Sequence, residues 1–299
     1  MAVGRPQVAD AEERWLSVNG IRTRYLFSAC SSGSPGLPVL LVHGLLGFSY
    51  SWRQNIAALS SFADIYAPDL PGVGYSARSP GLDCSLSGLA EFLLAFAADL
   101  QLRNFDVVAT SHGGALAMMA AAADAQAAGL SHRRIRRLVL VAPVNPWSAG
   151  RPWLTRMAAG RLGALCLRAS YPLLARANGI LLRRLYGDPA RMQAEAARNY
   201  ACAASLPGTA RHLSRIMKCW HRDIRLLAES LPAIRAIPTL LIWGTRDRAV
   251  LPSSAAPLAR SFDHVQVTMI PAAGHLPYEE TPGAFNDAVK HFLTAPTIA

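Results

Sequence analysis

The feature that most restricts the fold of this chain is a series of short, mainly apolar runs separated by longer segments with helical spacing. A strand that is apolar on both sides must be buried on both faces, as in a parallel sheet covered by helices. The intervening segments, such as 89–102 and the alanine-rich stretch from Gly113, have the apolar spacing of helices. The sequence therefore predicts an α/β fold with a mostly parallel sheet. The apolar runs are 39–44, 64–70, 105–110, 137–143, 238–244 and 265–271.

Two parts of the chain depart from this alternation. Residues 15–29 are typical of two half-exposed strands joined by an Asn-Gly turn, which predicts a β-hairpin at the edge of the sheet. Residues 145–232 contain no convincing strand but several helical stretches. We therefore expect one α/β domain with a helical insertion: a first core part at 1–144, a helical cap (lid) at 145–232 and a second core part at 233–299.

The composition excludes several classes of protein. Hydrophobic residues make up 52% of the 299 residues and charged ones 16%, which indicates a substantial core rather than disorder. The longest apolar run, 113–123, is too short for a transmembrane segment. The N-terminal residues lack the apolar stretch of a secretory signal. Five scattered cysteines without a Cys-x-x-Cys pair favour a reduced, cytoplasmic protein without a structural zinc site.

The net charge of +11 is concentrated in the predicted cap, because residues 150–232 hold 14 Lys and Arg against 4 Asp and Glu. No nucleic-acid motif accompanies this charge, so we expect no nucleic-acid partner. Three interpretations of the cap arginines stay open. They form a solvated surface, an amphipathic surface that contacts anionic lipid, or a pocket site that pairs with a substrate carboxylate or phosphate. The arginines are Arg151, Arg156, Arg161, Arg168, Arg176, Arg183 and Arg184.

Three side chains with the chemistry of nucleophilic catalysis follow three predicted strands. Ser111 follows the third strand, Asp247 the fifth and His275 the sixth. A catalytic serine needs a base that takes its proton and an acid that orients the base. In a parallel sheet such groups meet at the carboxyl ends of the strands, and this chain order fits that architecture. Asp69 is a rival acid, but its place before a proline favours a turn.

These residues, with HGLLG at 43–47 and DLPGVGYS at 69–76, resemble the α/β-hydrolase superfamily along essentially the whole chain. The stretch HGLLGFSYSWRQNI is most similar to the subgroup of haloalkane dehalogenases, epoxide hydrolases and cofactor-free esterases. The resemblance implies the α/β-hydrolase fold, a mostly parallel sheet with helices on both faces and an inserted helical cap. It also implies an oxyanion hole formed by the backbone N–H groups of Leu45 and His112, with no metal and no organic cofactor.

Two departures from the family pattern bear on the chemistry. Position 109 is Ala where the family usually has Gly, so we expect some strain there with the turn intact. Dehalogenases and epoxide hydrolases attack with an aspartate, whereas this chain has Ser111. If Ser111 attacked an alkyl halide or an epoxide, it would form an ether, and water could not release that ether by attack at an acyl carbon. We therefore expect a small-molecule acyl substrate. Esters are the first choice. A lactone or C–C bond hydrolase and a non-catalytic ligand-binding protein are the alternatives.

Other residues near the strand ends have less certain roles. Trp52 and Trp243 would either line the pocket or pack in the core. We expect Arg246 and Arg248, which flank Asp247, to help keep its carboxylate ionised.

Overall fold

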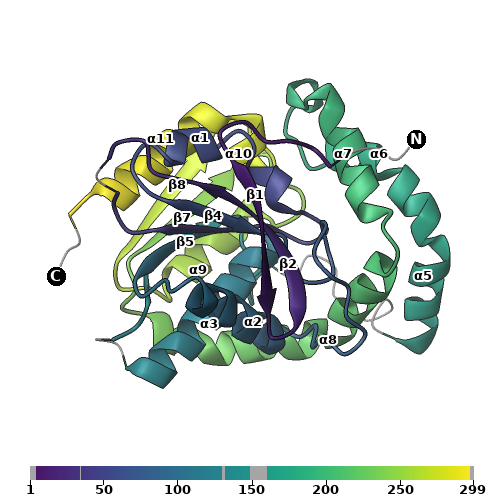
Figure 1. Ribbon diagram of the computed structural model, residues 1–299, viewed down its shortest axis with the longest axis horizontal. Helices are drawn as coiled ribbons and strands as arrows, with labels where there is room; N and C mark the ends of the chain where they lie inside the picture. The colour runs from purple at the N-terminus through teal and green to yellow at the C-terminus, as the bar shows by residue number, and fades with distance from the viewer. Residues whose placement is uncertain (1–4, 34, 130–131, 149–159, 297–299) are drawn as a thin grey trace.

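The computed structural model describes residues 5–33, 35–129, 132–148 and 160–296 (Figure 1). Its centre is an eight-stranded sheet with the order β1-β2-β4-β3-β5-β6-β7-β8. The strands from β3 to β8 run parallel, and the β1–β2 hairpin joins β4 in antiparallel pairing at one edge. This arrangement confirms the predicted fold class. The strands are β1 Glu12–Val18, β2 Ile21–Ser28, β3 Val39–Val42, β4 Ile65–Pro68, β5 Phe105–Thr110, β6 Ile135–Val141, β7 Thr239–Gly244 and β8 Val265–Ile270.

Helices cover both faces of the sheet. On one face lie α2, α3 and α9, and on the other α1, α10 and α11 (Figure 1). The central strands serve both layers because successive side chains point to opposite faces. Leu40 and Val42 of β3 therefore pack under α2 and α3, whereas Val39 and Leu41 pack in the opposite core. The helices are α1 Ile56–Leu59, α2 Leu86–Asp99, α3 His112–Ala128, α9 Ala255–Ala259, α10 Pro277–Glu280 and α11 Pro282–Thr294.

Between β6 and β7, where the sequence predicts a cap, the described residues form four α-helices. They are α5 Arg161–Arg176, α6 Asn178–Arg183, α7 Ala194–Ala204 and α8 Thr209–Ser230. The buried face of α8 includes Ile216 and Leu227, which join the core cluster under α3. Among the residues that the structure describes, no helix is long and apolar enough to cross a membrane. We propose that residues 145–232 form the cap and that α8 connects it to the core.

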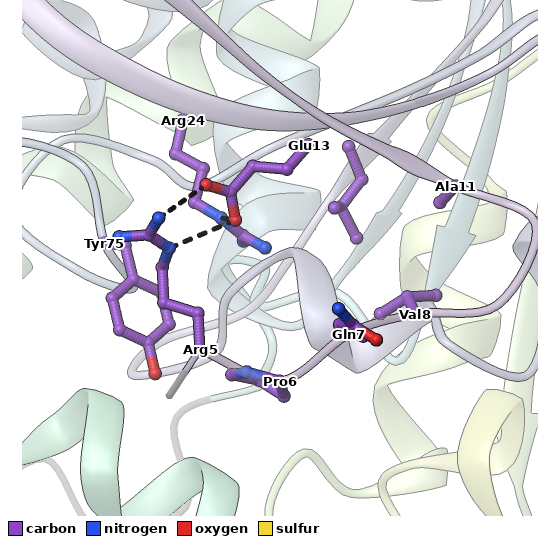
Figure 2. Close-up of a pocket in the computed structure, with 9 residues that line it drawn as sticks. Arg5, Pro6, Gln7, Val8, Ala11, Glu13, Arg24 and Tyr75 are labelled. Carbon is purple, nitrogen blue, oxygen red and sulfur yellow. Dashed lines mark hydrogen bonds and ion pairs between the residues drawn. The ribbon is translucent and has the colours of Figure 1, made fainter. Parts of the chain in front are cut away.

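A cavity of about 760 Å³ lies beside the N-terminal segment and the β1–β2 hairpin (Figure 2). Its charged side chains face one another. Glu13 of β1 accepts from Arg5 at 3.0 Å and from Arg24 of β2 at 2.9 Å. The charges that line this cavity therefore hold the N-terminal segment to the sheet.

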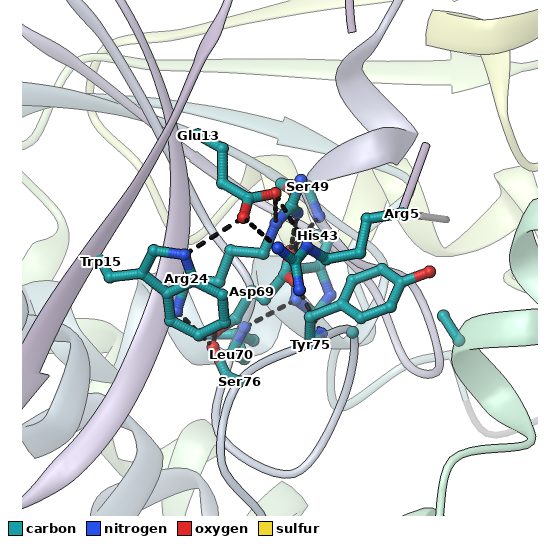
Figure 3. A network of polar contacts seen from close by, with 12 residues as sticks. Arg5, Glu13, Trp15, Arg24, His43, Ser49, Asp69, Leu70, Tyr75 and Ser76 are labelled. Atoms are coloured by element: carbon teal, nitrogen blue, oxygen red, sulfur yellow. Dashed lines mark hydrogen bonds and ion pairs between the residues drawn. The ribbon is translucent and has the colours of Figure 1, made fainter. Parts of the chain in front are cut away.

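Asp69, which follows β4, belongs to the same network of polar contacts (Figure 3). Its buried carboxylate lies 3.2 Å from Arg24 and accepts the backbone N–H groups of Ser49 and Tyr75, both at 2.8 Å. Position 74 must be glycine, because a Cβ there would lie 2.4 Å from an Asp69 oxygen. The Asp69 carboxylate therefore joins the hairpin, the loop after β3 and the loop after β4. This role supports its interpretation as a turn residue.

Asp69→Ala is expected to lower the free energy of unfolding by about 3 kcal/mol or more, because it leaves a buried guanidinium and two amides short of a partner. Urea denaturation measures this loss. Glu12→Gln is the control, since Glu12 forms an exposed pair with Arg14, and such pairs contribute less than about 1 kcal/mol. Equal losses in the two variants would contradict the structural role of Asp69.

Candidate active site

Ser111 occupies a sharp turn between β5 and α3. Its backbone has φ 55° and ψ −124°, a region that L-residues rarely adopt. Backbone hydrogen bonds hold it on both sides: the Ser111 N–H donates to Val141 at 2.9 Å, and its carbonyl accepts from Val144 at 2.9 Å and Gly114 at 3.0 Å. A strained residue fixed this firmly projects its side chain from the end of the strand, which is the position that a nucleophile needs.

The two glycines after Ser111 allow the close approach that this turn requires. A Cβ at position 113 would lie 2.3 Å from the His43 carbonyl oxygen, and one at position 114 would lie 2.6 Å from Pro143 Cβ. The strain expected at Ala109 is absent, because Ala109 is a regular buried residue of β5. The unusual backbone is at Ser111 itself, two residues further on.

His275 and Asp247 form a buried pair at the ends of β8 and β7. The His275 Nδ1 lies 2.8 Å from the Asp247 carboxylate. The same carboxylate accepts the backbone N–H groups of Ala249 at 2.8 Å and Val250 at 3.1 Å. The flanking arginines, 246 and 248, are exposed and form no ion pair with Asp247 in the described part of the chain. In this structure the hydrogen bonds to the Asp247 carboxylate, besides that of His275, come from these backbone amides.

Ser111 and His275 line one cavity of about 420 Å³. The pocket floor comes from the strand ends, and its roof comes from α6, α7 and the segment between them. Among the described residues no hydrogen bond joins the Ser111 hydroxyl to His275, although both residues line this cavity. The other lining residues are mainly apolar: Gly44, Leu45, Leu46, Gly47, Ser51, Leu181, Leu182, Arg184, Leu185, Tyr200, Ala249, Leu276 and Tyr278.

The residues predicted for the oxyanion hole lie beside Ser111. Leu45 lines the cavity, and His112 begins α3, where backbone N–H groups lack partners within the helix. The His112 ring points elsewhere and stacks on Trp220, with ring centroids 5.8 Å apart.

The two tryptophans that could line the pocket belong to the core instead. Trp52 is fully buried against Tyr278, with ring centroids 4.7 Å apart. Trp243 is also fully buried, and its indole N–H donates to the Val250 carbonyl at 3.0 Å. Neither lines the cavity that holds Ser111.

Sequence reasoning missed the paired carboxylates of Glu279 and Glu280, which tie the cap to the histidine loop. Glu280 accepts the backbone N–H groups of Gly187 at 3.0 Å, Asp188 at 2.8 Å and Gly274 at 2.7 Å. The first two belong to the cap and the third directly precedes His275. The signal was the Tyr-Glu-Glu run after the histidine, but its partners lie too far away in sequence for any spacing rule to find them.

Glu279 makes a second connection to the cap. Its carboxylate accepts the hydroxyls of Tyr200 and Tyr186, the latter at 3.0 Å, and pairs with Arg53 at 2.7 Å. The Tyr200 hydroxyl also lies 2.8 Å from Ser51 Oγ. Tyr200 and Ser51 both line the cavity, so the pocket wall is fixed by this network.

His43 has a structural role, as its loop position suggests. Its Nε2 accepts the backbone N–H of Leu70 at 2.9 Å, so Nδ1 carries the proton that is donated to the Gly44 carbonyl at 2.9 Å (Figure 3). Burial lowers the pKa of His43 and keeps the ring neutral. Burial likewise lowers the pKa of His112 to about 4 and that of His212 in α8 to about 3.

No group of three or more metal-binding side chains occurs within the described ranges. A parallel sheet that carries a serine on a strained strand–helix turn after β5, with a His–Asp pair at the ends of β7 and β8, is the architecture of an α/β hydrolase. The family model for the alpha/beta hydrolase fold matches residues 38–282. The chain belongs to this family and is a hydrolase of it.

Individual relatives extend this likeness over nearly the whole chain. Haloalkane dehalogenase 2 of Mycobacterium tuberculosis is 28% identical over 292 residues, covering 95% of this chain and 96% of that protein. The dihydrolipoyllysine-residue acetyltransferase component of the acetoin cleaving system of Pseudomonas putida is 26% identical over 87% of this chain, which spans 64% of that protein. The match to the haloalkane dehalogenase agrees with the resemblance to the dehalogenase and epoxide hydrolase group.

Two solved structures at 25% identity share the fold. A membrane phospholipase A, a bacterial virulence factor, has a TM-score of 0.76 and covers 95% of this chain and 86% of its own. The meta-cleavage product hydrolase CumD of Pseudomonas fluorescens IP01 has a TM-score of 0.73 and covers 93% of this chain and 96% of its own.

The low pKa values of the buried residues His112 and His212 predict that the folded protein loses stability as the pH falls. Their folded-state pKa values, about 4 and about 3, lie below the ordinary 6.5, so the unfolded chain takes up both protons at higher pH. Their contribution to stability is complete above about pH 6.5 and is lost as the pH falls toward 4. The free energy of unfolding should therefore fall by about 1.4 kcal/mol per pH unit for each histidine.

Urea denaturation at pH 7.5, 6.0 and 5.0 measures this slope. His212→Gln should reduce this slope by about 1.4 kcal/mol per pH unit, the contribution of one proton. His264→Gln, at an exposed position, should leave the slope unchanged. A stability that stays constant from pH 7.5 to 5.0 would show that these histidines are not held neutral.

Proposed function

We propose that this protein is a serine hydrolase that cleaves carboxylic esters through an acyl-enzyme intermediate. The observation that carries the proposal is the shared cavity of Ser111 and His275, with His275 held by Asp247 at 2.8 Å. Ser111 is the nucleophile, His275 the general base and Asp247 the residue that orients the base.

The His–Asp hydrogen bond explains how the base is prepared. With the Nδ1 proton donated to Asp247, the Nε2 of His275 is free to accept a proton. It takes the Ser111 hydroxyl proton as the oxygen attacks the ester carbonyl carbon. The carbonyl π electrons move to the oxygen, and the backbone N–H groups of Leu45 and His112 stabilise the resulting oxyanion.

The tetrahedral intermediate then collapses. The C–O bond to the alcohol breaks, the alcohol takes the proton from His275, and an acyl group remains on Ser111. A water molecule that gives its proton to His275 attacks this acyl carbon. Release of the carboxylic acid returns the proton to Ser111 and restores the free enzyme.

The lining of the cavity supports an apolar acyl group. Leucines from α6, from the segment after it and from the loop after β3 line the cavity. Burial of an acyl chain among these side chains gains about 0.8 kcal/mol for each CH₂ group. Cleavage of an acyl lipid by the structural relative named as a phospholipase A is chemistry of the same type.

A second candidate, hydrolysis of a C–C bond next to a carbonyl, is favoured by one observation. Arg184 lines the cavity that holds Ser111, so a guanidinium is available to pair with a substrate carboxylate. The relative named as a meta-cleavage product hydrolase supports this alternative. The proposed Ser111, His275 and Asp247 would serve both reactions.

Ser111→Ala is expected to lower kcat/KM on p-nitrophenyl esters by at least about 10³-fold, because it removes the nucleophile. Initial rates on esters of increasing acyl length measure the loss, and circular dichroism checks that the fold is retained. Ser253→Ala, an exposed serine, is the matched control and should retain full activity. Unchanged turnover in Ser111→Ala would exclude the mechanism.

Arg184→Gln separates the two candidates. If the substrate is a vinylogous diketone with a carboxylate, this change should raise its KM by about 10–100-fold, since a charge-assisted pair is lost. The KM for a neutral p-nitrophenyl ester should stay within about threefold. Arg183→Gln, whose side chain is exposed and does not line the cavity, is the control. Absence of C–C cleavage, followed by ultraviolet absorbance, would leave the ester reaction alone.

A further inference from the structure

The outer face of α5 and α6 carries exposed leucines that the proposed function does not use. Leu162 is 74% exposed, Leu173 is 69% exposed and Leu165 is 63% exposed, values that are unusual for leucine in a folded domain. Together with three neighbours they form a patch, which we call the leucine–arginine face. Its apolar members are Leu162, Leu165, Leu173, Leu174, Ile180 and Leu181.

This face is not the side on which α5 packs against the protein. Tyr171 and Ala175 of α5 are buried and cluster with Leu213 of α8. The exposed leucines at 162, 165 and 173 lie on the opposite side, because their spacing of three and eight residues repeats on one helix face. In Figure 1, α5 forms the edge of the molecule farthest from the sheet. The helix is therefore apolar on both sides, and its outer side is uncovered.

The charges in the segment that carries this face are all of one sign. Residues 125–187 contain no Asp or Glu, and five arginines lie between 160 and 187. Arg168, Arg183 and Arg184 have exposed side chains. Exposed leucines bordered by arginines are the composition of a surface that enters the headgroup region of an anionic membrane.

The face is continuous with the mouth of the proposed active site. Leu181 and Arg184 are exposed, and both also line the cavity that contains Ser111 and His275. Leu182 and Leu185, their neighbours, line the same cavity. An apolar path thus leads from the outer surface of α6 to the serine.

We propose that the leucine–arginine face docks on an anionic lipid bilayer and presents the cavity mouth to acyl lipids in it. The docking step stands on the exposed leucines and the charge. The choice of acyl lipids as substrate rests in addition on the proposed esterase function. The leucines enter the boundary between headgroups and acyl chains, and the arginines pair with lipid phosphates.

Charge argues for a membrane over a second copy of this chain. A symmetric dimer through this face would bring two sets of arginines together with no acidic residue in either segment to pair with them. An anionic bilayer attracts the same arginines, each by a factor of about five in affinity near the surface.

The test is co-sedimentation with vesicles, using Ser111→Ala protein so that no lipid is consumed. Binding is compared between vesicles of phosphatidylcholine and vesicles containing about one third phosphatidylglycerol. We expect strong binding to the anionic vesicles only, weakened by 0.5 M NaCl. A protein that binds neither vesicle, or both equally, overturns the proposal.

Two sets of variants locate the surface. Leu162→Ser, Leu165→Ser and Leu173→Ser combined should weaken vesicle binding by at least about tenfold. Arg168→Gln combined with Arg183→Gln should weaken it by about 30-fold. The controls are Leu37→Ser with Leu251→Ser, and Arg103→Gln with Arg260→Gln, which are exposed positions outside this segment. Controls that weaken binding as much as the test variants would overturn the assignment of the face.

Other measurements keep docking and catalysis apart. In the chain with Ser111 intact, the triple leucine variant should hydrolyse a water-soluble p-nitrophenyl ester at the unchanged rate and lose activity only on an ester embedded in anionic vesicles. If the unsubstituted chain hydrolyses neither ester, this result would count against the proposed function. The docking proposal would then be decided by co-sedimentation alone. Light scattering measures the oligomeric state. A dimer that dissociates when the three leucines are substituted would assign the face to a second copy of the chain and overturn the membrane proposal.

Discussion

The buried carboxylates of Glu279 and Glu280 are the interaction on which the cavity depends. Two adjacent carboxylates are costly to bury unless each is fully hydrogen-bonded. Here one accepts three backbone amides, and the other accepts two tyrosine hydroxyls and pairs with Arg53. Their partners belong to the cap, to the loop before His275 and to the turn after β3. These three segments contribute to the walls of the cavity, so the two glutamates at the end of α10 fix their relative positions.

A second polar network is organised in the same way around Asp69. Its carboxylate holds the turn at Ser49, while His43 as a neutral ring joins the loop after β3 to Leu70. The unusual φ of Ser111 is maintained by backbone hydrogen bonds and by glycines that admit close contact. The nucleophile proposed here is therefore positioned by rigid neighbours on both sides.

The sequence predicted those parts of the structure that local periodicity encodes. Buried strands have an apolar pattern of their own, so the sheet and the strand ends that carry Ser111, Asp247 and His275 could be located. Contacts between distant segments have no such pattern. The amide support of Asp247, the role of Glu280 and the core positions of Trp52 and Trp243 follow from how loops fold over one another. The direction in which the cap leucines face was equally hidden, because α5 is apolar on both sides.

The hydrogen bond from the His275 N–H to the Leu185 carbonyl, at 2.6 Å, has a consequence for how this enzyme family diversifies. A cap inserted between two strands can change its length and sequence freely only where it does not touch the reacting groups. Here the segment 185–188 is in effect part of the histidine loop, since a Cβ at Gly274 would lie 2.3 Å from the Leu185 oxygen. A variant of this chain in which the helices before Leu185 are exchanged would therefore have to keep segment 185–188 unchanged to preserve the backbone of the histidine loop.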